Sequence, residues 1–548
     1  MDERRKVHKK RPGRRGNGLV TAIAAVAGIL AIYKRIPLTN RIGDNGNAYF
    51  GMAYDTYLFF FLFCGYSMQA VVAKMMSARY SRGQYRNSRR VWNVAFLFTL
   101  IAGLAGTLLM LSLSGVLAEG LYQTRIAMVV IQYTAPTILI TSLLGLMRGY
   151  FQGMGTVVPT VLSRFVEELA GLLLMLVLSQ ALGNYGQKIG ALLLASDYEQ
   201  AFGAAGGILG FMAGSAVALL LLFILYLMFQ ASFRKKERKD VGKGMDGYRR
   251  IARLVASSAF PVILIGFAMS GSFFLDQIFY FHLLPSSQDT ITQWGIYTGK
   301  YRILSGIPIA MVTAVCTALI PSLSVSVASQ NTGRMKEKAY LMLKLAWTLA
   351  LPVTVFLAIT ADTLLPALFT TGDMETAASL LRVGSVATVL QGLCIGLFAA
   401  LQGLEREKNL LIHAVIALVA HVAALCLFLA NLDQGIRGVV YANIVLYAVF
   451  LILNLITLFR LISARIDWGR LIGIPVIATA VMGVVVFFLN RLLAGKLSAG
   501  ILSLLCFAAA LILYTLLILA LHGVSERELR GVPGGGGLVF LGKALRLM

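Results

Sequence analysis

The chain has few charged residues for its length. Only 13% of its 548 residues are Asp, Glu, Lys or Arg, whereas 58% are hydrophobic and the mean hydropathy is +0.78. Soluble globular domains are about one-quarter charged. The shortage of charge therefore argues against a soluble multidomain enzyme and favours a membrane protein.

Cysteine is scarce as well, and its spacing carries no recognisable chemistry. The chain has five cysteines: Cys64, Cys316, Cys394, Cys426 and Cys506. All five lie in apolar stretches without CxxC or metal-ligand spacing, so they are interpreted as small core residues. No metal site, zinc site or redox site is predicted.

Acidic residues are the scarcer charged class, with 24 Asp and Glu against 49 Lys and Arg and a net charge of +25. A basic excess of this size can indicate nucleic-acid binding. Here, however, the cations gather in short segments between apolar runs, without an aromatic-interleaved patch. The basicity is interpreted as membrane topology, and no nucleic-acid partner is predicted.

Catalytic motifs are missing too. No Ser/His/Asp set or HExxH motif indicates hydrolysis, and no catalytic residue is assigned. The tail 537–544 nearly matches GxxxxGK[ST] but has Ala544 where the magnesium-binding Ser or Thr belongs. A transporter rather than an enzyme is expected, without a cofactor, and coupling to the membrane potential or an ion gradient stays open. His413 and His421 share one helix face, where packed histidines are favoured over a proton relay.

What the chain does have is long apolar runs. About fourteen runs reach the roughly 20 residues that a spanning helix needs, so the fold class is an all-α polytopic membrane protein. The expected organisation is a basic cytoplasmic tail 1–18, an N-lobe of six spans 19–232, a basic linker 233–253, a C-lobe of six spans 254–460, two extra helices 461–522 and a cytoplasmic tail 523–548. The expected location is multi-pass, in the cytoplasmic membrane of a bacterium.

The connecting segments alternate in charge along the chain. With the N-terminus in the cytoplasm, 37 of the 49 Lys and Arg residues fall in inner segments. The positive-inside rule then places both termini in the cytoplasm, which requires an even number of spans.

An ionic group lies well inside the predicted fifth span. Arg164, Glu167 and Glu168 follow Thr156 within one apolar run, which puts the cation about 12 Å into a hydrocarbon core roughly 30 Å thick. Charges at that depth are costly unless they pair or face a wet cavity. We expect Arg164 to pair with Glu167 or Glu168 on the same helix face, and the roles of structure, gate and coupling site stay open.

A second group of cations lies at the outer ends of spans. Lys34, Arg35 and Arg41 close the first span, and Lys300 and Arg302 open the eighth. One interpretation is snorkelling towards the headgroups. The other is a cavity between the lobes that holds an anion, because Arg matches phosphate oxygens in a bidentate fork.

Several short motifs occur in a recognisable order: Tyr33-Lys-Arg-Ile-Pro-Leu38, Arg41-Ile-Gly-Asp-Asn-Gly46, Arg148-Gly-Tyr-Phe-Gln-Gly153, Val158-Pro-Thr-Val-Leu-Ser163 with Glu167, Ile307-Pro-Ile, Ile320-Pro-Ser-Leu-Ser324 and Leu401-Gln-Gly403. Across about residues 19–525 the chain resembles the polysaccharide biosynthesis branch of the multidrug/oligosaccharidyl-lipid/polysaccharide exporter superfamily, in particular its stage V sporulation protein B and MurJ-like group.

The resemblance implies a flippase for an undecaprenyl-pyrophosphate-linked sugar, with the peptidoglycan precursor lipid II first among the candidates. It also implies a cationic cavity between two lobes, a lipid-tail groove beside the last two helices, and contacts with membrane lipids. Cell-wall synthesis proteins are a further class of partner that the resemblance leaves open. A cation that some relatives place in the second helix has no clear counterpart, since Lys74 comes later. The substrate-binding candidates are Arg35, Lys34, Arg41, Lys300, Arg302 and Lys74, and the gating or coupling candidates are Arg164, Glu167, Glu168, Asp276, Arg148 and Gln152.

Three alternatives stay open. A multidrug cation antiporter of the same superfamily needs an anionic, aromatic cavity, for which Asp55, Asp276, Glu167 and Glu168 are available. A flippase could also serve another polysaccharide lipid intermediate. A non-transporting envelope scaffold predicts that the charges inside the membrane are dispensable.

Overall fold

The computed structural model describes residues 14–195, 197–240, 244–285, 287–462, 467–530 and 535–545. Parts of the expected tails and of the linker 233–253 lie outside these residues. Every regular element in the described ranges is helical, as the apolar runs predict. The near-match to a phosphate-binding loop lies within α20 (Gly535–Ala544), which is a helix.

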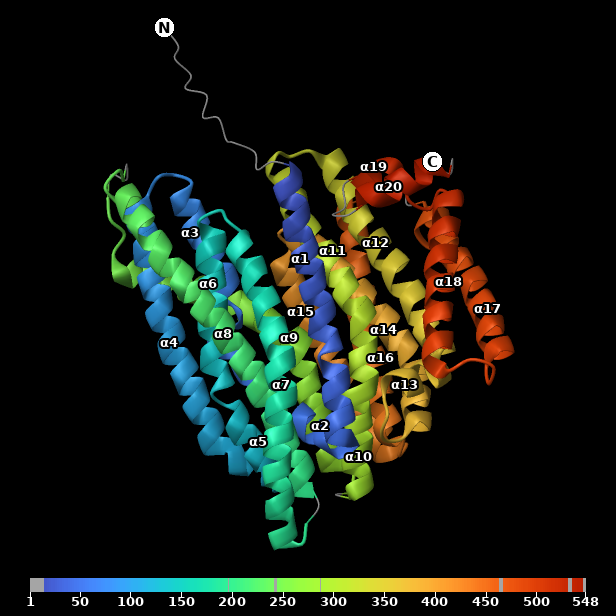
Figure 1. The fold of residues 1–548 in the computed structure, drawn as a ribbon. Coiled ribbons are helices and arrows are strands. Elements are labelled where there is room, and N and C mark those ends of the chain that lie inside the picture. Colours follow the sequence, from blue (N-terminus) through green and yellow to red (C-terminus); the bar gives the residue numbers. More distant parts are fainter. Residues whose placement is uncertain are drawn as a thin grey trace.

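The first part of the chain forms eight helices. They are α1 (Arg14–Tyr33), α2 (Arg35–Phe61), α3 (Met68–Tyr80), α4 (Tyr85–Gly115), α5 (Ala127–Thr134), α6 (Thr137–Gly153), α7 (Val158–Leu193) and α8 (Asp197–Glu237), with π-helical turns η1 (Leu62–Tyr66) and η2 (Val116–Leu121). Figure 1 shows α3 to α8 side by side in one half of the molecule. Glycines spaced four residues apart on α8 let the backbone of α7 approach closely.

The rest of the chain adds twelve helices. They are α9 (Tyr248–Leu283), α10 (Gln288–Ile296), α11 (Arg302–Ala328), α12 (Thr332–Ile359), α13 (Ala361–Leu368), α14 (Met374–Gly403), α15 (Glu407–Cys426), α16 (Gly435–Ile462), α17 (Ile474–Leu493), α18 (Ala499–Ala520), α19 (Glu526–Arg530) and α20, with π-helical turns η3 (Tyr297–Tyr301), η4 (Leu427–Asn431) and η5 (Gly469–Gly473). Helices α17 and α18 lie at the outer edge, and α19 and α20 lie at the end of the molecule where α1 begins (Figure 1).

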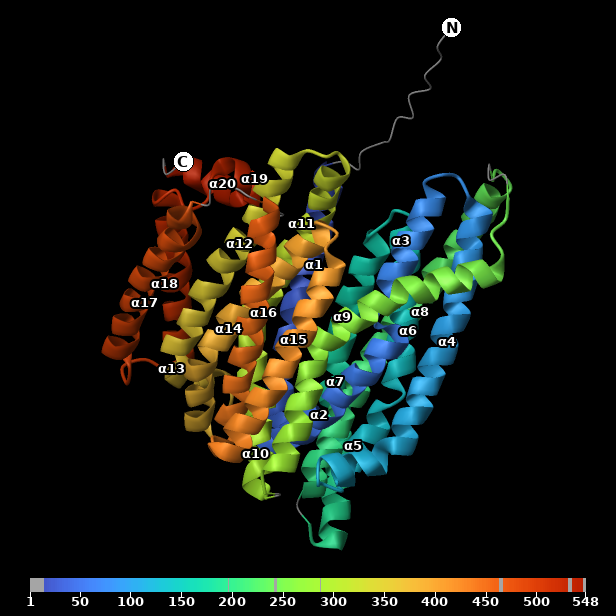
Figure 2. The ribbon, with the colours of Figure 1, turned by 180° about the vertical axis from the view of Figure 1, so that it is seen from behind.

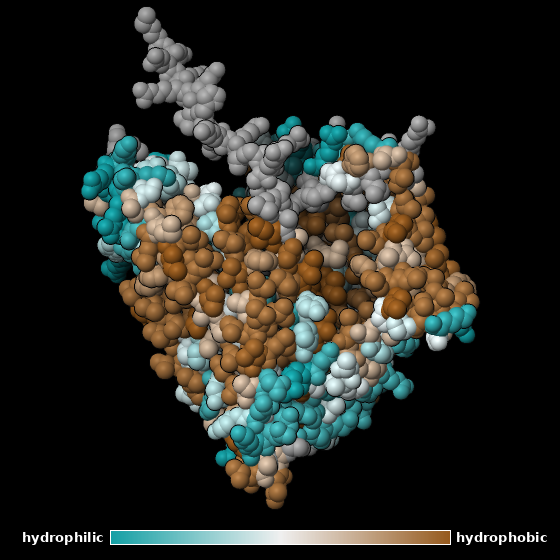
Figure 3. Space-filling view, in the orientation of Figure 1, coloured by the Kyte–Doolittle hydropathy of each residue, from teal (hydrophilic) through white to brown (hydrophobic). Residues whose placement is uncertain are grey.

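Eleven helical stretches in the described residues are long and apolar enough to cross a membrane, compared with the fourteen expected. The first of them, Ile23–Tyr80, has 58 residues. An unbroken helix of that length would extend about 87 Å, nearly three times the hydrocarbon core. The stretch instead turns at Gly43, whose φ of 67° is accessible to glycine at little cost. An apolar band lies between two polar ends of the molecular surface (Figure 3).

Helix α9 is shared between the two halves. Ile251, Val255 and Ala259 in its first part belong to the same core cluster as buried residues of α3, α4, α6 and α8. In its last part, Asp276 contacts His421 on α15. Figure 2 shows that α9 runs obliquely from the side of α3, α4 and α8 to α15. A movement of one half relative to the other therefore acts on this helix.

Candidate functional site

A cavity of about 320 Å³ lies between the two halves. Its walls come from α1, α2, α7, α8, η3 and α11. Seven polar or charged side chains are among its lining residues: Lys34, Arg35, Tyr54, Asp55, Glu168, Thr298 and Arg302. Three of the six predicted substrate-binding residues therefore lie together, although Arg35 and Arg302 are 267 positions apart in the sequence.

Breaks in regular helix bring these cations to the cavity. Lys34 is the residue between α1 and α2, and Arg302 follows directly after the π-helical turn η3. A π-helical turn shifts the register of the following side chains and is frequent at functional sites. The two breaks place the ends of α1 and the start of α11 on the same cavity.

Arg302 is held by a carboxylate from the other half. Its two terminal nitrogens donate to Asp55 Oδ2 at 2.6 Å and to Asp55 Oδ1 at 3.0 Å. The guanidinium also lies 4.3 Å from the centre of the Phe273 ring on α9. A bidentate ion pair with Asp55 and a cation–π contact with Phe273 fix the position of Arg302.

Arg35 has no comparable carboxylate partner. Its guanidinium lies 3.7 Å from the centre of the Phe50 ring and donates one hydrogen bond, of 3.3 Å, to Asn47 Oδ1. Its second terminal nitrogen is buried without a hydrogen-bond partner among the described residues. An unused, buried donor on a cation is costly unless a ligand or water completes it.

Lys34 pairs with Glu168 at 2.6 Å and lies near the Phe211 ring. The cavity therefore contains three cations and two carboxylates, with Arg35 as the uncompensated charge. Such a surplus attracts an anion, and two guanidinium groups match the oxygens of a phosphate or diphosphate.

The remaining substrate-binding candidates lie elsewhere. Lys300 is fully buried and pairs with Asp44 at 2.5 Å, and Asp44 also accepts the Asp373 backbone N–H at 3.2 Å. Arg41 lines a separate pocket of about 360 Å³. Lys74 is exposed on α3. The Lys300 contact joins α2, η3 and the start of α14 at the end of the molecule opposite α19.

The predicted pairing within α7 differs from what the structure contains. Glu167 accepts a hydrogen bond of 2.6 Å from Arg148 on α6, and Glu168 pairs with Lys34, between α1 and α2. Arg164 is exposed. Both carboxylates form their ion pairs with cations outside α7 rather than with Arg164, so helical spacing alone gave the wrong partners.

The Arg148 pair belongs to a closed polar network within the first half. Arg148 Nε donates to Ser163 Oγ at 3.0 Å, and Ser215 Oγ donates to Glu167 Oε1 at 2.7 Å. Gln152 lies half-buried one turn further along α6. Asp276, the last gating candidate, is buried between α9, α15 and α16. Of the six gating or coupling candidates, only Glu168 lines the cavity.

Sequence reasoning missed the role of Asp55 beside Arg302 and did not assign Asp44 or Asn47. The available signal for Asp55 was a single carboxylate within an apolar stretch, the same depth argument that singled out Arg164. The signal was read only as a feature of a cation transporter. Its partner, 247 residues away, could not be identified from spacing.

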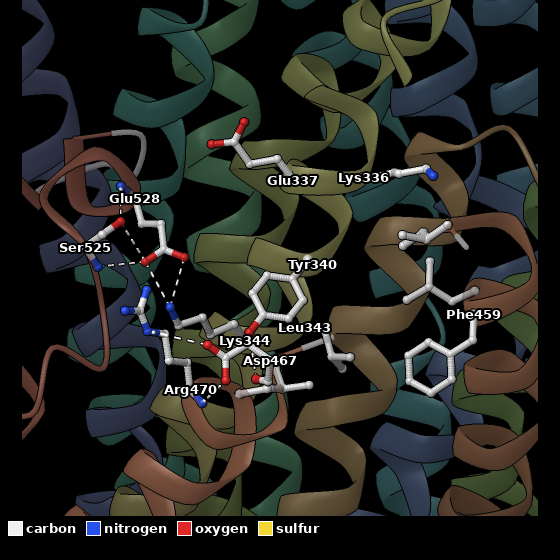
Figure 4. Close-up of a pocket in the computed structure, with 13 residues that line it drawn as sticks. Lys336, Glu337, Tyr340, Leu343, Lys344, Phe459, Asp467, Arg470, Ser525 and Glu528 are labelled. Carbon is white, nitrogen blue, oxygen red and sulfur yellow. Dashed lines mark hydrogen bonds and ion pairs between the residues drawn. The ribbon is translucent and has the colours of Figure 1, made fainter. Parts of the chain in front are cut away.

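Two further pockets adjoin α12. One, of about 430 Å³, is almost entirely apolar and lies between α11, α12, α17 and α18. The other, of about 310 Å³, lies where α12, α16 and η5 meet the tail. Figure 4 shows Lys344 in this second pocket between the tail residue Glu528 and the Asp467–Arg470 pair, with Lys344 Nζ 2.9 Å from both Glu528 carboxylate oxygens.

The fold, the central cavity and the similarity to known proteins together define a multi-pass membrane transporter of the multidrug/oligosaccharidyl-lipid/polysaccharide exporter superfamily. The model of the polysaccharide biosynthesis protein family matches residues 15–327, more than half of the chain, and the chain belongs to this family. The recognition from short motifs is confirmed.

Two relatives come from Bacillus subtilis (strain 168). The lipid II flippase MurJ is 24% identical over 435 residues, which cover 76% of this chain and 78% of the relative. Stage V sporulation protein B is 20% identical over 532 residues, covering 96% and 98%.

Solved structures share the fold. The lipid II flippase MurJ in an inward closed conformation gives a TM-score of 0.62 at 12% identity, covering 91% of this chain and 97% of that one. An inward-facing multidrug resistance transporter of the MATE family gives 0.61 at 16% identity, covering 82% and 100%. At these identities the similarity shows the fold alone.

Proposed function

We propose that this transporter is a flippase that moves an undecaprenyl-pyrophosphate-linked sugar across the cytoplasmic membrane of a bacterium by alternating access. Lipid II is the first candidate substrate. The observation that carries the proposal is Arg35, a half-buried cation without a carboxylate partner and with one buried, unpaired nitrogen, beside Arg302 in a cavity between the two halves. A diphosphate supplies the acceptors and the negative charge that this site lacks.

The apolar pocket between α11, α12, α17 and α18 supports a lipid-linked substrate. Helix α11 contributes Arg302, Ile303 and Gly306 to the charged cavity, and Met311 and Val315 to the apolar pocket. The two sites thus lie along one helix, so a single molecule can keep its headgroup in the first and its hydrocarbon tail in the second. One of the two relatives is a lipid II flippase, which agrees with this class of substrate.

A multidrug cation antiporter is the second candidate. Asp55 and Glu168 line the cavity, and a MATE-family transporter shares the fold. Both carboxylates, however, already have cationic partners, Arg302 and Lys34. The uncompensated charge is positive, which favours an anionic substrate.

We also propose fourteen spans, with both termini in the cytoplasm. Counting Ile23–Tyr80 as two spans separated by the turn at Gly43, and adding the 36-residue helices α7 and α9 to the remaining ten stretches, gives this number. Labelling of single cysteines at Lys188 and Gly244 tests the orientation, since Lys188 is expected to react from outside and Gly244 from inside.

Substrate binding tests the proposed function directly. Native mass spectrometry of the purified full-length protein would measure binding of lipid II and of undecaprenyl phosphate. We expect the Arg35→Ala, Arg302→Ala double variant to lose most lipid II binding, and each single alanine variant to fail to restore growth of a strain depleted of its lipid II flippase. Lysine at either position should recover only part of the activity, because a point charge replaces a planar fork.

Arg41→Ala is the matched control, because this cation lies close to Arg35 in the sequence but lines a different pocket. It should bind lipid II like the unmodified protein. Equal lipid II binding by the double variant and the unmodified protein would overturn the diphosphate site. Loss of transport in Asp55→Asn and Glu168→Gln, with both arginines dispensable, would favour the antiporter.

A further inference from the structure

Gly306 of α11 lines the cavity one helical turn away from Arg302. The α11 residues in the cavity wall are Arg302, Ile303 and Gly306. Positions three and four apart lie on one face of a helix, so Gly306 is on the same face as Arg302. The wall beside the proposed diphosphate site therefore has a position without a side chain.

Neither packing nor backbone conformation accounts for this glycine. Among the described residues, a Cβ atom on Gly306 would meet nothing within 4 Å beyond its chain neighbours and its own helix backbone. Its φ is not positive, so other residues can adopt the same conformation. Glycine in a helix interior is about 1 kcal/mol less favourable than alanine. The reason for a glycine at this position therefore lies outside the fold of α11.

Gly51, the second glycine in the cavity wall, differs in this respect. A Cβ atom on Gly51 would lie 2.8 Å from Thr298 Cγ2. Gly51 is therefore needed for the close approach of α2 and η3, as small residues are in other contacts between membrane helices. Gly51 serves the contact between the halves, whereas Gly306 leaves space open in the cavity.

The open space has polar surroundings. Besides Arg302, the cavity is lined by Tyr54 and by the Lys34–Glu168 ion pair. Hydroxyl groups both donate and accept hydrogen bonds, so they can satisfy such side chains, which a hydrocarbon chain cannot do. The almost entirely apolar pocket between α11, α12, α17 and α18 suits a hydrocarbon chain instead. The space at Gly306 therefore suits a sugar.

A side chain at position 306 would fill much of this space. A water molecule occupies about 30 Å³ of the liquid, so the four carbon atoms of a leucine side chain take on the order of 100 Å³. The cavity has a volume of about 320 Å³. A ligand with a bulky group beyond the diphosphate would lose its place, whereas a diphosphate at the arginines would keep its contacts.

We infer that Gly306 is a specificity-determining residue, which leaves space for the sugar attached to the diphosphate and thereby sets how bulky a headgroup the cavity accepts. The inference rests on the proposed function, because it assigns one part of that substrate to one part of the cavity. The effect of Gly306 is steric, and the charge of the cavity does not depend on it.

Two lipids that share the diphosphate but differ in the sugar test this assignment. Native mass spectrometry of the purified full-length protein would compare the binding of lipid II with that of undecaprenyl pyrophosphate, which has no sugar. The unmodified protein should bind both. Gly306→Leu should lower lipid II binding about tenfold or more and change undecaprenyl pyrophosphate binding less than about twofold, because the leucine meets the sugar and not the diphosphate. Retained binding of the second lipid also shows that the variant is folded.

Two further variants separate space from other effects of the substitution. Gly306→Ala removes the conformational freedom of glycine close to Pro308 but adds a single methyl group, so it should reduce lipid II binding much less than Gly306→Leu. Gly115→Leu is the matched control. Gly115 is also a half-buried helical glycine with nothing within 4 Å of its Cβ position, and it lies on α4, outside the cavity wall. Gly115→Leu should bind both lipids like the unmodified protein.

The open space can also be measured without a lipid. In a cysteine-free background, a single cysteine at Gly306 should react with a charged methanethiosulfonate reagent. A cysteine at Val312, which is fully buried on the same helix, should not react.

Equal lipid II binding by Gly306→Leu and the unmodified protein would contradict the inference, and so would an equal loss of both lipids. Damage by Gly306→Ala as large as that by Gly306→Leu would show that backbone freedom matters rather than space. A cysteine at Gly306 that reacts no faster than one at Val312 would show that the space is closed. Binding of neither lipid by the unmodified protein would instead overturn the proposed function, and the inference with it.

Discussion

The cavity and the contact around Lys300 both join the two halves through ionic groups, but they differ in how their charges are compensated. Lys300 and Asp44 form a buried one-to-one pair, and Asp44 gains an additional backbone hydrogen bond. In the cavity, Arg302 is matched by Asp55 and Lys34 by Glu168, whereas Arg35 remains in excess. The first arrangement is complete without a ligand, and the second is not.

The Arg148 network in the first half is also complete without a ligand, in contrast to Arg35 in the cavity. Its guanidinium and the Glu167 carboxylate satisfy one another and two serine hydroxyls. Removing one partner of such a buried ionic pair strongly destabilises the folded protein. The comparison suggests that charge surplus, rather than burial or depth in the membrane, separates the groups that serve a ligand from those that serve the fold.

The largest expected effect separates these two classes. Arg148→Ala leaves the buried Glu167 carboxylate without its cation and should lower the free energy of unfolding by roughly 3–5 kcal/mol. Arg35→Ala removes a cation that has no carboxylate partner, so it should change stability by less than about 1 kcal/mol while transport is lost. Thermal unfolding of the purified variants, together with complementation, measures both quantities.

The double variant Arg148→Met, Glu167→Leu is the control, because it removes both charges and keeps the apolar bulk. It should be more stable than Arg148→Ala alone. Comparable destabilisation by Arg35→Ala and Arg148→Ala would remove the distinction between a ligand site and a structural pair.

Only part of this arrangement could be predicted from sequence. The apolar runs predicted the helical fold. The depth of charges in those runs singled out Glu167 and Glu168, and the position of cations at the outer ends of spans singled out Arg35 and Arg302. Helical spacing compares residues on a single helix only, so it paired Arg164 with its own neighbours. Ionic pairs between different helices cannot be found in this way. Lys300 and Asp44, for example, lie 256 residues apart and meet only through packing of the two halves.

The π-helical turn η3 shows a second limit. It shifts the register between Lys300 and Arg302, which places one cation in the contact between the halves and the other in the cavity. Such a turn depends on local packing and has no clear sequence signature. The two residues could therefore be assigned to one cluster from sequence but not to their separate roles.

A smaller change should weaken the Lys300 contact. Gly372 has a φ of 84°, and a Cβ at this position would overlap the Asp44 carboxylate and crowd Lys300 Nζ. Gly372→Ala should therefore open this end of the molecule more often. The measurement is the rate at which a membrane-impermeant maleimide modifies a single cysteine at the half-buried Asn40, with an expected increase of about tenfold if the contact loses about 1.4 kcal/mol.

Gly155→Ala is a close control. Gly155 has nearly the same backbone conformation, with a φ of 86°, but a Cβ there would meet nothing within 4 Å. Both variants bear the cost of a side chain at positive φ, roughly 1–2 kcal/mol, and only Gly372→Ala disturbs the ion pair. Equal maleimide rates in the two variants would mean that the Lys300–Asp44 contact does not hold this end closed.

The smallest expected effect concerns the ion pair between Lys344 and the tail residue Glu528 (Figure 4). This pair lies at the end of the molecule opposite the Lys300–Asp44 contact. Burial opposes ionisation of Glu528, but the Ser525 backbone N–H and Lys344 outweigh it and hold the pKa of this carboxyl below its ordinary value of 4.5. A lowered folded-state pKa means that the stabilisation is complete above that value and is lost as the pH falls through the folded-state pKa. Limited proteolysis of the segment Val524–Arg530 with an acid-tolerant protease should therefore accelerate only in that acidic range.

Glu528→Gln should make the segment sensitive to protease near neutral pH and remove most of the acid-dependent change, because the buried Lys344 then has no anionic partner. Glu526→Gln, on the same short helix but in an exposed pair with Arg530 and Lys543, should alter cleavage little. Since Val524 and Leu529 also line the apolar pocket, release of α19 exposes the proposed tail site at the end nearest α19. Unchanged cleavage of the Glu528→Gln protein would show instead that apolar contacts alone hold the tail, and that the Lys344 pair contributes little to its docking.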